Sequence, residues 1–344
     1  MKVKGVIIGS GLSGLKSYAL LSKQLSSPPL IIDFTFGGSL VLPVDITKLS
    51  RVVPKIPIFI STELASFFPY CNIKCLPLEV IVLKEGDLID KVKGYTTINV
   101  QRLWIYEILK KNEVCFFIEP NDCIFKSLNI AGNTSLNRVR DNIRKIDVER
   151  KNIVTSQGLI IEYDFIVYTW PIHSLRNILA NISDISVNKM LATVDSALNY
   201  VSIYSQLYLI NEKISEQKIS VFVHGTKTYR MHTTVKVPIS DNLYAIYVLT
   251  SYSKSYPLHA GIGEKLYSEA KKLGLINPAA IIDYADVNIT YGFLGTENLN
   301  IVDELRQALG NYNIHLFGRI AEWREYDVAT LLLKAVPTIP ELRW

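Results

Sequence analysis

The chain has 344 residues, of which 49% are hydrophobic and 20% are charged, and its formal net charge is +5. Because a single domain typically spans about 100 to 200 residues, this length predicts two domains. The lysines and arginines are scattered, which gives no indication of a nucleic-acid partner. No uncharged apolar stretch approaches the roughly 18 residues that a membrane span requires. We therefore expect a soluble globular protein without a membrane span.

The four cysteines, Cys71, Cys75, Cys115 and Cys123, are few for a chain of this size. Cys71 and Cys75 have a C-x3-C spacing without nearby histidines, which is a poor zinc signature, and no metal site is expected. Free cysteine is most often a small buried side chain, so we expect reduced, structural thiols. The N-terminal residues also lack the charged, apolar and small-residue regions that mark an export signal. Both observations favour a cytoplasmic protein.

The N-terminal residues predict a βαβ unit. Val3–Ile8 is a short apolar run typical of a buried parallel strand, and a helical pattern follows the glycine turn Gly9–Gly14. Two serines and two prolines end that pattern before the strand-like Leu30–Ile32. In this G-x-G-x-x-G turn, the glycines allow a tight turn, close approach of a pyrophosphate and packing of the helix on the strand. The predicted phosphate-binding residues are Gly9, Ser10, Gly11, Leu12, Ser13 and Gly14.

An acidic residue follows the second strand. Asp33 stands nineteen positions after Gly14, where a carboxylate can bind the hydroxyl groups of a ribose. The arrangement predicts dinucleotide binding, with a glycine turn that merely packs as the alternative. Asp33 followed by Gly37-Gly38 resembles the superfamily of flavoprotein amine oxidases, protoporphyrinogen oxidases and UDP-galactopyranose mutases, although the spacer is shorter here. The resemblance implies contacts to FAD from Phe34, Gly37, Gly38 and Ser39, and an ordinary surface turn is the alternative.

Residues 139–169 predict a β-meander that returns to a buried strand. The expected strands are 139–146, 153–155, 159–161 and 163–169. The same stretch resembles the part of the superfamily in which one strand passes the adenine and a later strand ends beside the cofactor. The resemblance implies a backbone contact from Val139 to the adenine and a wall around the AMP half made by Thr169, Trp170 and Pro171. A plain three-stranded connection is the alternative.

Two inserts between these pieces predict a second domain. The first contains an extended loop with prolines and a helix-like stretch at 101–111. The second is rich in Tyr, Val, Ile and Thr, as antiparallel strands should be, with expected strands at 201–209, 219–224, 228–236 and 243–251. The turn at 228–232 resembles the substrate-domain stretch of mutase-like and oxidase-like flavoproteins. Arg230 and His232 are therefore candidates for catalysis, and a solvated sheet face is the alternative for both. Tyr291 is a further candidate.

The C-terminal region predicts a strand at 313–317, a glycine turn and a helix at 328–336. Residues 318–327 read GRIAEWREYD and resemble the GRyaeWrYxdmd motif of UDP-galactopyranose mutases and related oxidases. In that motif a strand delivers a Gly-Arg pair to the cofactor phosphates. Gly318 would allow close backbone approach, and Arg319 would donate charge-assisted hydrogen bonds to phosphate. The alternative is a packing turn with an exposed arginine.

The residues after this turn are expected to start the helix beside the cofactor. Asp327 is a natural N-cap, because its carboxylate can accept from backbone amides of the first turn. The amides of Val328 and Ala329 could then stabilise negative charge on a reduced flavin. The resemblance also implies that Tyr326 lies at the cofactor.

The motifs together predict an α/β protein. With its second domain, the whole chain is expected to be α+β. Its Rossmann-type FAD-binding domain, with a central parallel sheet and a β-meander, is expected at 1–60, 125–185 and 285–344. A substrate or cap domain with an antiparallel sheet and helices is expected at 61–124 and 186–284. A second G-x-G-x-x-G followed by an acid is absent from the sequence, so a dedicated NAD(P)H domain is not expected.

Three functions agree with this pattern. The first is an FAD-dependent oxidoreductase in which a small organic substrate transfers a hydride to flavin N5. The second is a UDP-galactopyranose mutase-like isomerase that uses reduced FAD as a nucleophile. The third is a non-catalytic FAD-binding protein. We place the oxidoreductase first, because no arginine pair for a nucleotide diphosphate is evident beyond Arg230, and the sequence leaves the oligomeric state open.

Overall fold

The computed structural model describes residues 1–35, 53–66, 68–118, 125–130 and 136–336. The chain forms two compact units, each built from separated segments. Unit 1 comprises Met1–Gly38, Ile124–Asn199 and Thr296–Trp344, and unit 2 comprises Ser39–Cys123 and Tyr200–Gly295. The first segment of unit 1 thus ends at residue 38. The motifs predict instead that the first segment of the FAD-binding domain extends to residue 60. In the described part of the chain, no helix combines the length and the apolar character needed to cross a membrane.

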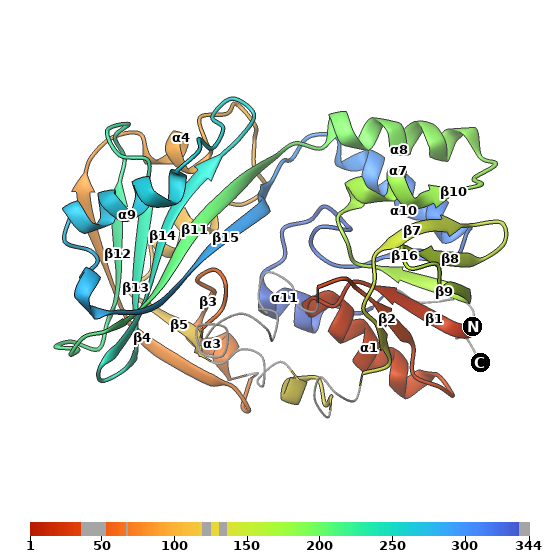
Figure 1. The fold of residues 1–344 in the computed structure, drawn as a ribbon, viewed down its shortest axis with the longest axis horizontal. Helices are drawn as coiled ribbons and strands as arrows, with labels where there is room; N and C mark the ends of the chain where they lie inside the picture. The colour runs from red at the N-terminus through yellow and green to blue at the C-terminus, as the bar shows by residue number, and fades with distance from the viewer. Residues whose placement is uncertain (36–52, 67, 119–124, 131–135, 337–344) are drawn as a thin grey trace. The chain divides into compact units, whose positions relative to one another are not determined.

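Unit 1 is built on a mixed sheet whose centre is parallel (Figure 1). Strand β1 pairs in parallel with β2 on one side and with β9 on the other. Strands β6 and β16 extend the parallel part next to β2 and β9, while β7 and β8 are antiparallel. The strands are β1 (Lys2–Ile8), β2 (Leu30–Ile32), β6 (Arg138–Val139), β7 (Ile143–Asp147), β8 (Asn152–Thr155), β9 (Ile160–Tyr168), β10 (Leu179–Ala180) and β16 (Ile314–Leu316).

Helices cover the unit 1 sheet. The helix after the glycine turn packs on β1 and β9, and two other helices, at residues 185–197 and 299–310, pack on each other. Their hydrophobic stripes explain the packing, since Leu15 and Leu21 of the first helix are almost completely buried. In the described part of unit 1 the helices are α1 (Leu12–Gln24), α7 (Leu175–Ile178), α8 (Ile185–Ala197), α10 (Leu299–Gly310) and α11 (Val328–Leu333), with a short helical stretch at 125–127 and a 3-10 turn at Ile172–Ser174.

Two strand predictions for unit 1 need correction. The strand expected at 139–146 is divided into β6 and β7, because the Asp141 carboxylate accepts from the amides of Asn142 and Gln157 and turns the chain. The strands expected at 159–161 and 163–169 form one continuous strand, β9. Glu162, at the predicted break, pairs with Lys2 of β1 and with Asn152 of β8, so the strand continues through this residue.

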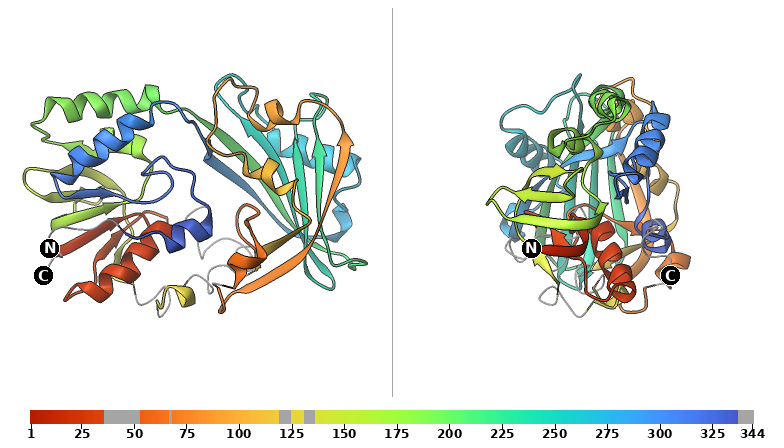
Figure 2. Two further views of the ribbon diagram at one scale, coloured as in Figure 1. Left: turned by 180° about the vertical axis from the view of Figure 1, so that it is seen from behind. Right: turned by 90° about the vertical axis from the view of Figure 1, so that its right-hand side faces the viewer.

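Unit 2 contains a large sheet in the order β15-β11-β14-β13-β12-β4-β5-β3, strongly curled in Figure 2. Neighbouring strands are antiparallel except for the parallel pair of β12 and β4. The strands are β3 (Phe59–Ile60), β4 (Asn72–Lys84), β5 (Glu113–Ile118), β11 (Tyr200–Asn211), β12 (Ile219–His224), β13 (Thr233–Ser240), β14 (Leu243–Tyr252) and β15 (Ile281–Leu294).

Both faces of this sheet carry a hydrophobic core. One core includes the helix α5 (Trp104–Ile108), and the other packs under α9 (Ile262–Lys272). The short helices α3 (Thr62–Ala65) and α4 (Leu88–Val92) and a 3-10 turn at Pro278–Ala280 complete the described helices. Helix α5 is shorter than the stretch 101–111 suggested, and β13 starts at residue 233 because 228–232 forms the preceding turn.

The expectation of reduced thiols is wrong. Cys75 on β4 and Cys115 on β5 form a disulfide, and Cys71 is also disulfide-bonded. The register of the two antiparallel strands places Cys75 directly opposite Cys115, which brings their side chains together. Cys123 lies outside the described residues. The cytoplasmic location therefore loses the support that reduced thiols gave it and stays a prediction.

Candidate functional site

The glycine turn after β1 is closed by backbone contacts. Gly9 has a φ of +106°, a conformation that L side chains rarely adopt, and its amide donates to the carbonyl of Ile32 at 3.0 Å. A Cβ on Gly14 would lie 1.9 Å from the Gly9 carbonyl oxygen, so the turn requires glycine at both positions. These two glycines hold the start of α1 against the end of β1.

Gly11 is the N-cap of α1 and differs from these two glycines. Its φ of −70° and ψ of −174° describe extended backbone that any residue adopts, so the backbone conformation does not itself require glycine here. Glycine has no side chain with which to cap this end of the 13-residue helix. A helix N-terminus without a side-chain cap can offer its first backbone amides to an anion.

The end of β9 lies against the same turn. Thr169 Oγ1 donates to the Ile8 carbonyl at 2.8 Å, because the parallel strands β9 and β1 end at the same edge of the sheet. A Cβ on Gly9 would lie 2.3 Å from Thr169 Oγ1 and 2.9 Å from Trp170 Cδ1. The Pro171 carbonyl, one residue on, accepts from two hydroxyl groups. The structure thus brings Thr169 and Trp170 to the glycine turn.

Asp33, which follows β2, binds the glycine turn through its carboxylate. Its carboxylate accepts from the Ser10 amide at 2.6 Å and from the Ser10 hydroxyl at 2.7 Å. Burial raises the pKa of the Asp33 carboxyl above its usual value, and the hydrogen bonds from Ser10 act in the opposite direction. The carboxylate therefore lies at the glycine turn, within reach of any group that binds there.

Asp33 and Phe34 also contact residues 139 and 140. The Asp33 amide donates to the Val139 carbonyl at 3.2 Å, so the expected adenine-contacting strand does lie beside β2. Phe34 is exposed, and its carbonyl accepts from Arg140 Nε at 3.3 Å. The predicted residues Gly37, Gly38 and Ser39 lie outside the described residues.

The C-terminal Gly-Arg turn reaches the first turn of α1. Gly318 has a φ of +102°, and a Cβ on it would lie 2.1 Å from Ser13 Oγ. Strand β16 brings it there, since β16 pairs in parallel with β9 and the Phe317 amide donates to the Tyr168 carbonyl at 3.0 Å. Residues 9–14, 33, 169–170 and 318 therefore meet around one helix terminus.

Arg319 is engaged by a carboxylate in this structure. Its Nε and Nη2 atoms donate to the two carboxylate oxygens of Glu325, each at 2.7 Å. Nearby, the buried Glu322 carboxylate accepts from the Gly318 amide at 2.8 Å and from Lys334 Nζ at 2.7 Å. Tyr326 accepts from the same Lys334 ammonium. Arg319 is thus part of a structured turn, with its side chain 22% exposed and paired with Glu325.

Helix α11 follows this turn and is shorter than predicted. Asp327 is its N-cap and accepts from the Thr330 amide at 2.6 Å, and the helix ends at Leu333. The buried Lys16 of α1 donates to the carbonyls of Leu331 and Leu332 at 3.0 and 2.7 Å, and to that of Lys334. Burial, and then the charge of Lys334, lower the pKa of Lys16 to about 8.

Sequence reasoning missed Lys16. The signal that could have found it is a lysine on the buried stripe of α1, between Leu15 and Tyr18, where a long charged side chain needs polar partners. Its role is to bind the C-terminal carbonyls of α11, which are otherwise unsatisfied at a helix end. Lys16 therefore fixes α11 to the helix that carries the glycine turn.

Two of the catalysis candidates in unit 2 are buried, which makes the solvated-face alternative wrong. Arg230 is 4% exposed, and its guanidinium lies 3.4 Å from the centroid of the Tyr256 ring and donates to the Pro257 carbonyl at 3.0 Å. His232 is fully buried between the hydroxyl groups of Thr233 and Ser251, at 2.9 and 3.0 Å. Burial, with smaller contributions from Lys91 and Arg230, lowers the pKa of His232 to about 3.

The hairpin turn that contains Arg230 is held by two further buried groups that the sequence did not reveal. The Glu269 carboxylate of α9 accepts from the backbone amides of Arg230 and Met231 at 2.8 to 3.0 Å. Lys91 donates to the carbonyls of His224 and Thr226 at 2.8 and 2.7 Å. Both Glu269 and Lys91 bind backbone groups of the turn. Their evident role is therefore to stabilise its conformation.

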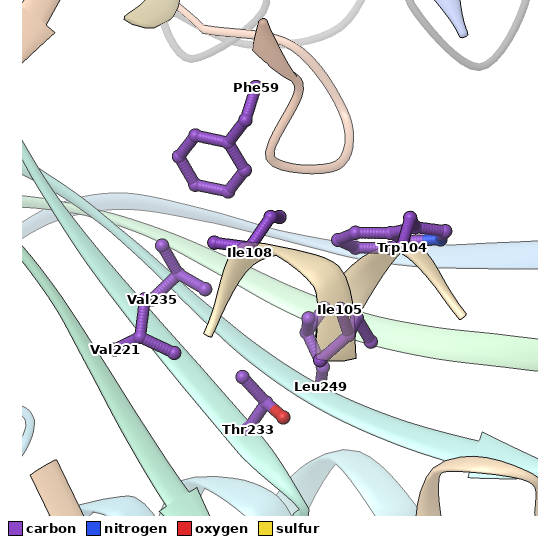
Figure 3. Close-up of a pocket in the computed structure, with 8 residues that line it drawn as sticks. All are labelled: Phe59, Trp104, Ile105, Ile108, Val221, Thr233, Val235 and Leu249. Carbon is purple, nitrogen blue, oxygen red and sulfur yellow. The ribbon is translucent and has the colours of Figure 1, made fainter. Parts of the chain in front are cut away.

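A small apolar hollow lies on the α5 side of the unit 2 sheet (Figure 3). In the figure, three side chains of α5 and Phe59 face the side chains of the strands beneath them. The interior has room for about one water-sized molecule. The residues that line the hollow are Phe59, Trp104, Ile105, Ile108, Val221, Thr233, Val235 and Leu249.

Tyr291, the third candidate for catalysis, lies on β15 with its ring centroid 4.6 Å from that of Tyr200.

The comparisons with known proteins concern the fold. No protein-family model and no curated protein sequence matches the chain. A structure of reduced UDP-galactopyranose mutase is similar with a TM-score of 0.71 and 13% identity, covering 93% of this chain and 89% of the mutase. A putrescine oxidase double mutant with redesigned cofactor binding is similar with a TM-score of 0.63 and 10% identity, covering 96% and 97%. This shared fold confirms the predicted fold class.

Proposed function

We propose that the chain binds one FAD on unit 1 and acts as an FAD-dependent oxidoreductase on a small organic substrate. The observation that carries the proposal is the meeting of four separated segments at the N-terminus of α1. Two solved structures with this fold come from a UDP-galactopyranose mutase and an oxidase, which agrees with the superfamily that the motifs resemble.

The residues at this terminus suit a pyrophosphate and a ribose. The first-turn amides of α1 would bind phosphate oxygens, and the absence of a side chain at Gly11 would leave space for them. Asp33 would share its carboxylate between Ser10 and a ribose hydroxyl. In this proposal the adenosine half extends from the glycine turn toward Val139, Thr169 and Trp170. Unit 1 is then the FAD-binding domain, and unit 2 the substrate domain.

When bound, FAD would supply an acceptor for a hydride at its N5 atom. The chain would position the flavin and stabilise its charge. Asp327 accepts a hydrogen bond from the first turn of α11 and so fixes that turn. We assign to the backbone amides of Val328 and Ala329 the role of stabilising negative charge on the reduced flavin. No catalytic side chain is assigned in unit 2, because Arg230 and His232 are buried among their own partners.

A mutase-like isomerase is the second candidate. The specific observation that favours it is the turn at 318–327, whose sequence resembles the mutase motif and which lies against the first turn of α1. The oxidoreductase stays first because the cation that sequence analysis offered for a nucleotide diphosphate, Arg230, is 4% exposed and stacked on Tyr256.

The test starts with the colour of the purified protein. We expect a yellow protein with one FAD per chain after acid release, and full reconstitution when FAD is added to the stripped protein. Gly11→Val should keep the secondary structure, because the backbone conformation at this position suits any residue, and should lose FAD. A colourless protein that binds NAD but not FAD would overturn the proposal.

The reaction class is tested by anaerobic titration. A substrate that bleaches the oxidised flavin identifies an oxidoreductase. Turnover of a nucleotide sugar only after reduction with dithionite identifies an isomerase. A flavin that responds to neither treatment across a panel of amines, porphyrinogens and nucleotide sugars supports the non-catalytic alternative.

A further inference from the structure

The Arg319–Glu325 pair is tight and largely shielded from water. Two parallel hydrogen bonds of 2.7 Å join the guanidinium to the carboxylate, and the side chains are 22% and 8% exposed. Bidentate pairs of this kind fix the plane of the guanidinium as well as its position. The motif that residues 318–327 resemble has Tyr where Glu325 stands, so the pair is a feature of this chain.

The backbone of the turn places Glu325 beside Arg319. The Glu322 amide donates to the Gly318 carbonyl at 2.9 Å, and the Arg324 amide donates to the Arg319 carbonyl at 3.0 Å. Trp323 has a φ of +51°, which is unusual for a bulky residue, and its side chain is fully buried. The buried ring holds this backbone conformation, and the chain reversal returns residue 325 to residue 319.

The contacts indicate that the pair persists when a ligand binds. If Arg319 moved from Glu325 to a phosphate, the Glu325 carboxylate, which is 8% exposed, would lose both hydrogen bonds from the guanidinium. A shielded carboxylate that loses its ion-pair partner is strongly disfavoured. We therefore expect a ligand of Arg319 to bind the intact pair.

We propose that Glu325 is the positioning residue of Arg319. It holds the guanidinium of Arg319, the residue after Gly318, in one position before the cofactor binds, so that a phosphate meets a group already fixed in place. This inference rests on the proposed function, since it takes FAD as the ligand. Its consequence is that the two side chains act as one unit: the contribution of Arg319 to FAD affinity depends on Glu325.

The test is a double-mutant cycle on the dissociation constant of FAD, measured by quenching of flavin fluorescence with the stripped full-length protein. We expect Arg319→Ala to weaken FAD roughly ten- to a hundred-fold, since its contact is worth about 1.5 to 3 kcal/mol. Glu325→Gln should weaken FAD by at least about three-fold, and adding Arg319→Ala to it should cost less than in the wild-type background. Glu325→Asp, which restores the charge, should recover part of the loss.

A matched control separates positioning from general stability. Asp303→Asn breaks the Arg324–Asp303 pair, which has a similar 2.8 Å contact in the same unit but is 36% and 42% exposed. This variant should bind FAD as the wild type does, and thermal unfolding of the stripped variants should show which changes loosen the fold. FAD binding by Glu325→Gln that is unchanged or tighter, or additive effects in the cycle, would overturn the inference. A wild type that binds no FAD would instead overturn the proposed function.

Discussion

His232 makes the protein sensitive to acid. Its ring is fully buried, and its pKa is about 3 in the folded protein against an ordinary value of 6.5. Between these values the unfolded chain binds a proton that the folded chain does not, so stability is fully present above pH 6.5 and is lost as the pH falls. At 1.36 kcal/mol per unit, the loss attributable to His232 is about 2 kcal/mol at pH 5 and approaches about 5 kcal/mol only below pH 3.

The assay is urea unfolding of the stripped protein at pH 7, 6 and 5. His232→Asn can still hydrogen-bond to Thr233 and Ser251 but does not titrate, so its free energy of unfolding should fall by about 2 kcal/mol less than that of the wild type between pH 7 and 5. His259→Asn, at an exposed position in the same unit, should follow the wild type. Parallel curves for wild type and His232→Asn would refute the assignment.

Three further predictions concern unit 1. Gly14→Ala places a Cβ 1.9 Å from the Gly9 carbonyl oxygen and should destabilise the protein by more than about 1 kcal/mol in thermal unfolding, whereas Gly310→Ala, which has open space, should not. Lys16→Met should abolish a rise in stability between about pH 8 and 10.5, because the wild-type amine loses its proton earlier when folded than when unfolded. Asp327→Ala should cost about 1 kcal/mol through the lost N-cap, and Asp327→Asn should cost less.

The sequence predicts the regions where local signals are strong. The strand β2 and the strand β12 have the bounds that the sequence indicated, and β1, α1 and β16 differ by only a few residues. Apolar runs ended by glycine, serine or proline specify these elements without reference to distant parts of the chain. The Asp327 N-cap belongs to the same class, since it depends on residues three positions apart.

The long strand β4 shows why other elements escaped prediction. It contains Pro77 and several charged residues, and its side chains are partly exposed along most of its length. Its parallel partner is β12, which lies about 140 residues later in the chain, so pairing depends on the finished sheet. The disulfide between Cys75 and Cys115 escaped for the same reason, because only the β4–β5 register places the two cysteines opposite each other.

Within the candidate site, the residues that the sequence identified are those whose roles belong to the backbone. Gly9, Gly14 and Gly318 are needed for positive φ angles or close approach, which a sequence motif records directly. The side-chain partners Lys16 and Glu325 were not identified, because their contacts arise from packing between α1 and α11 and from the turn at Trp323.

The large share of backbone groups in the site also explains why the fold is similar to solved structures although no family model matches the sequence. A site made of amides, a few glycines and one carboxylate constrains few positions, because hydrogen bonds from backbone groups are the same for every side chain. The rest of the chain is then free to change as long as the hydrophobic pattern of each element is kept. A fold similar to that of reduced UDP-galactopyranose mutase at 13% identity, with no matching family model, is the expected result.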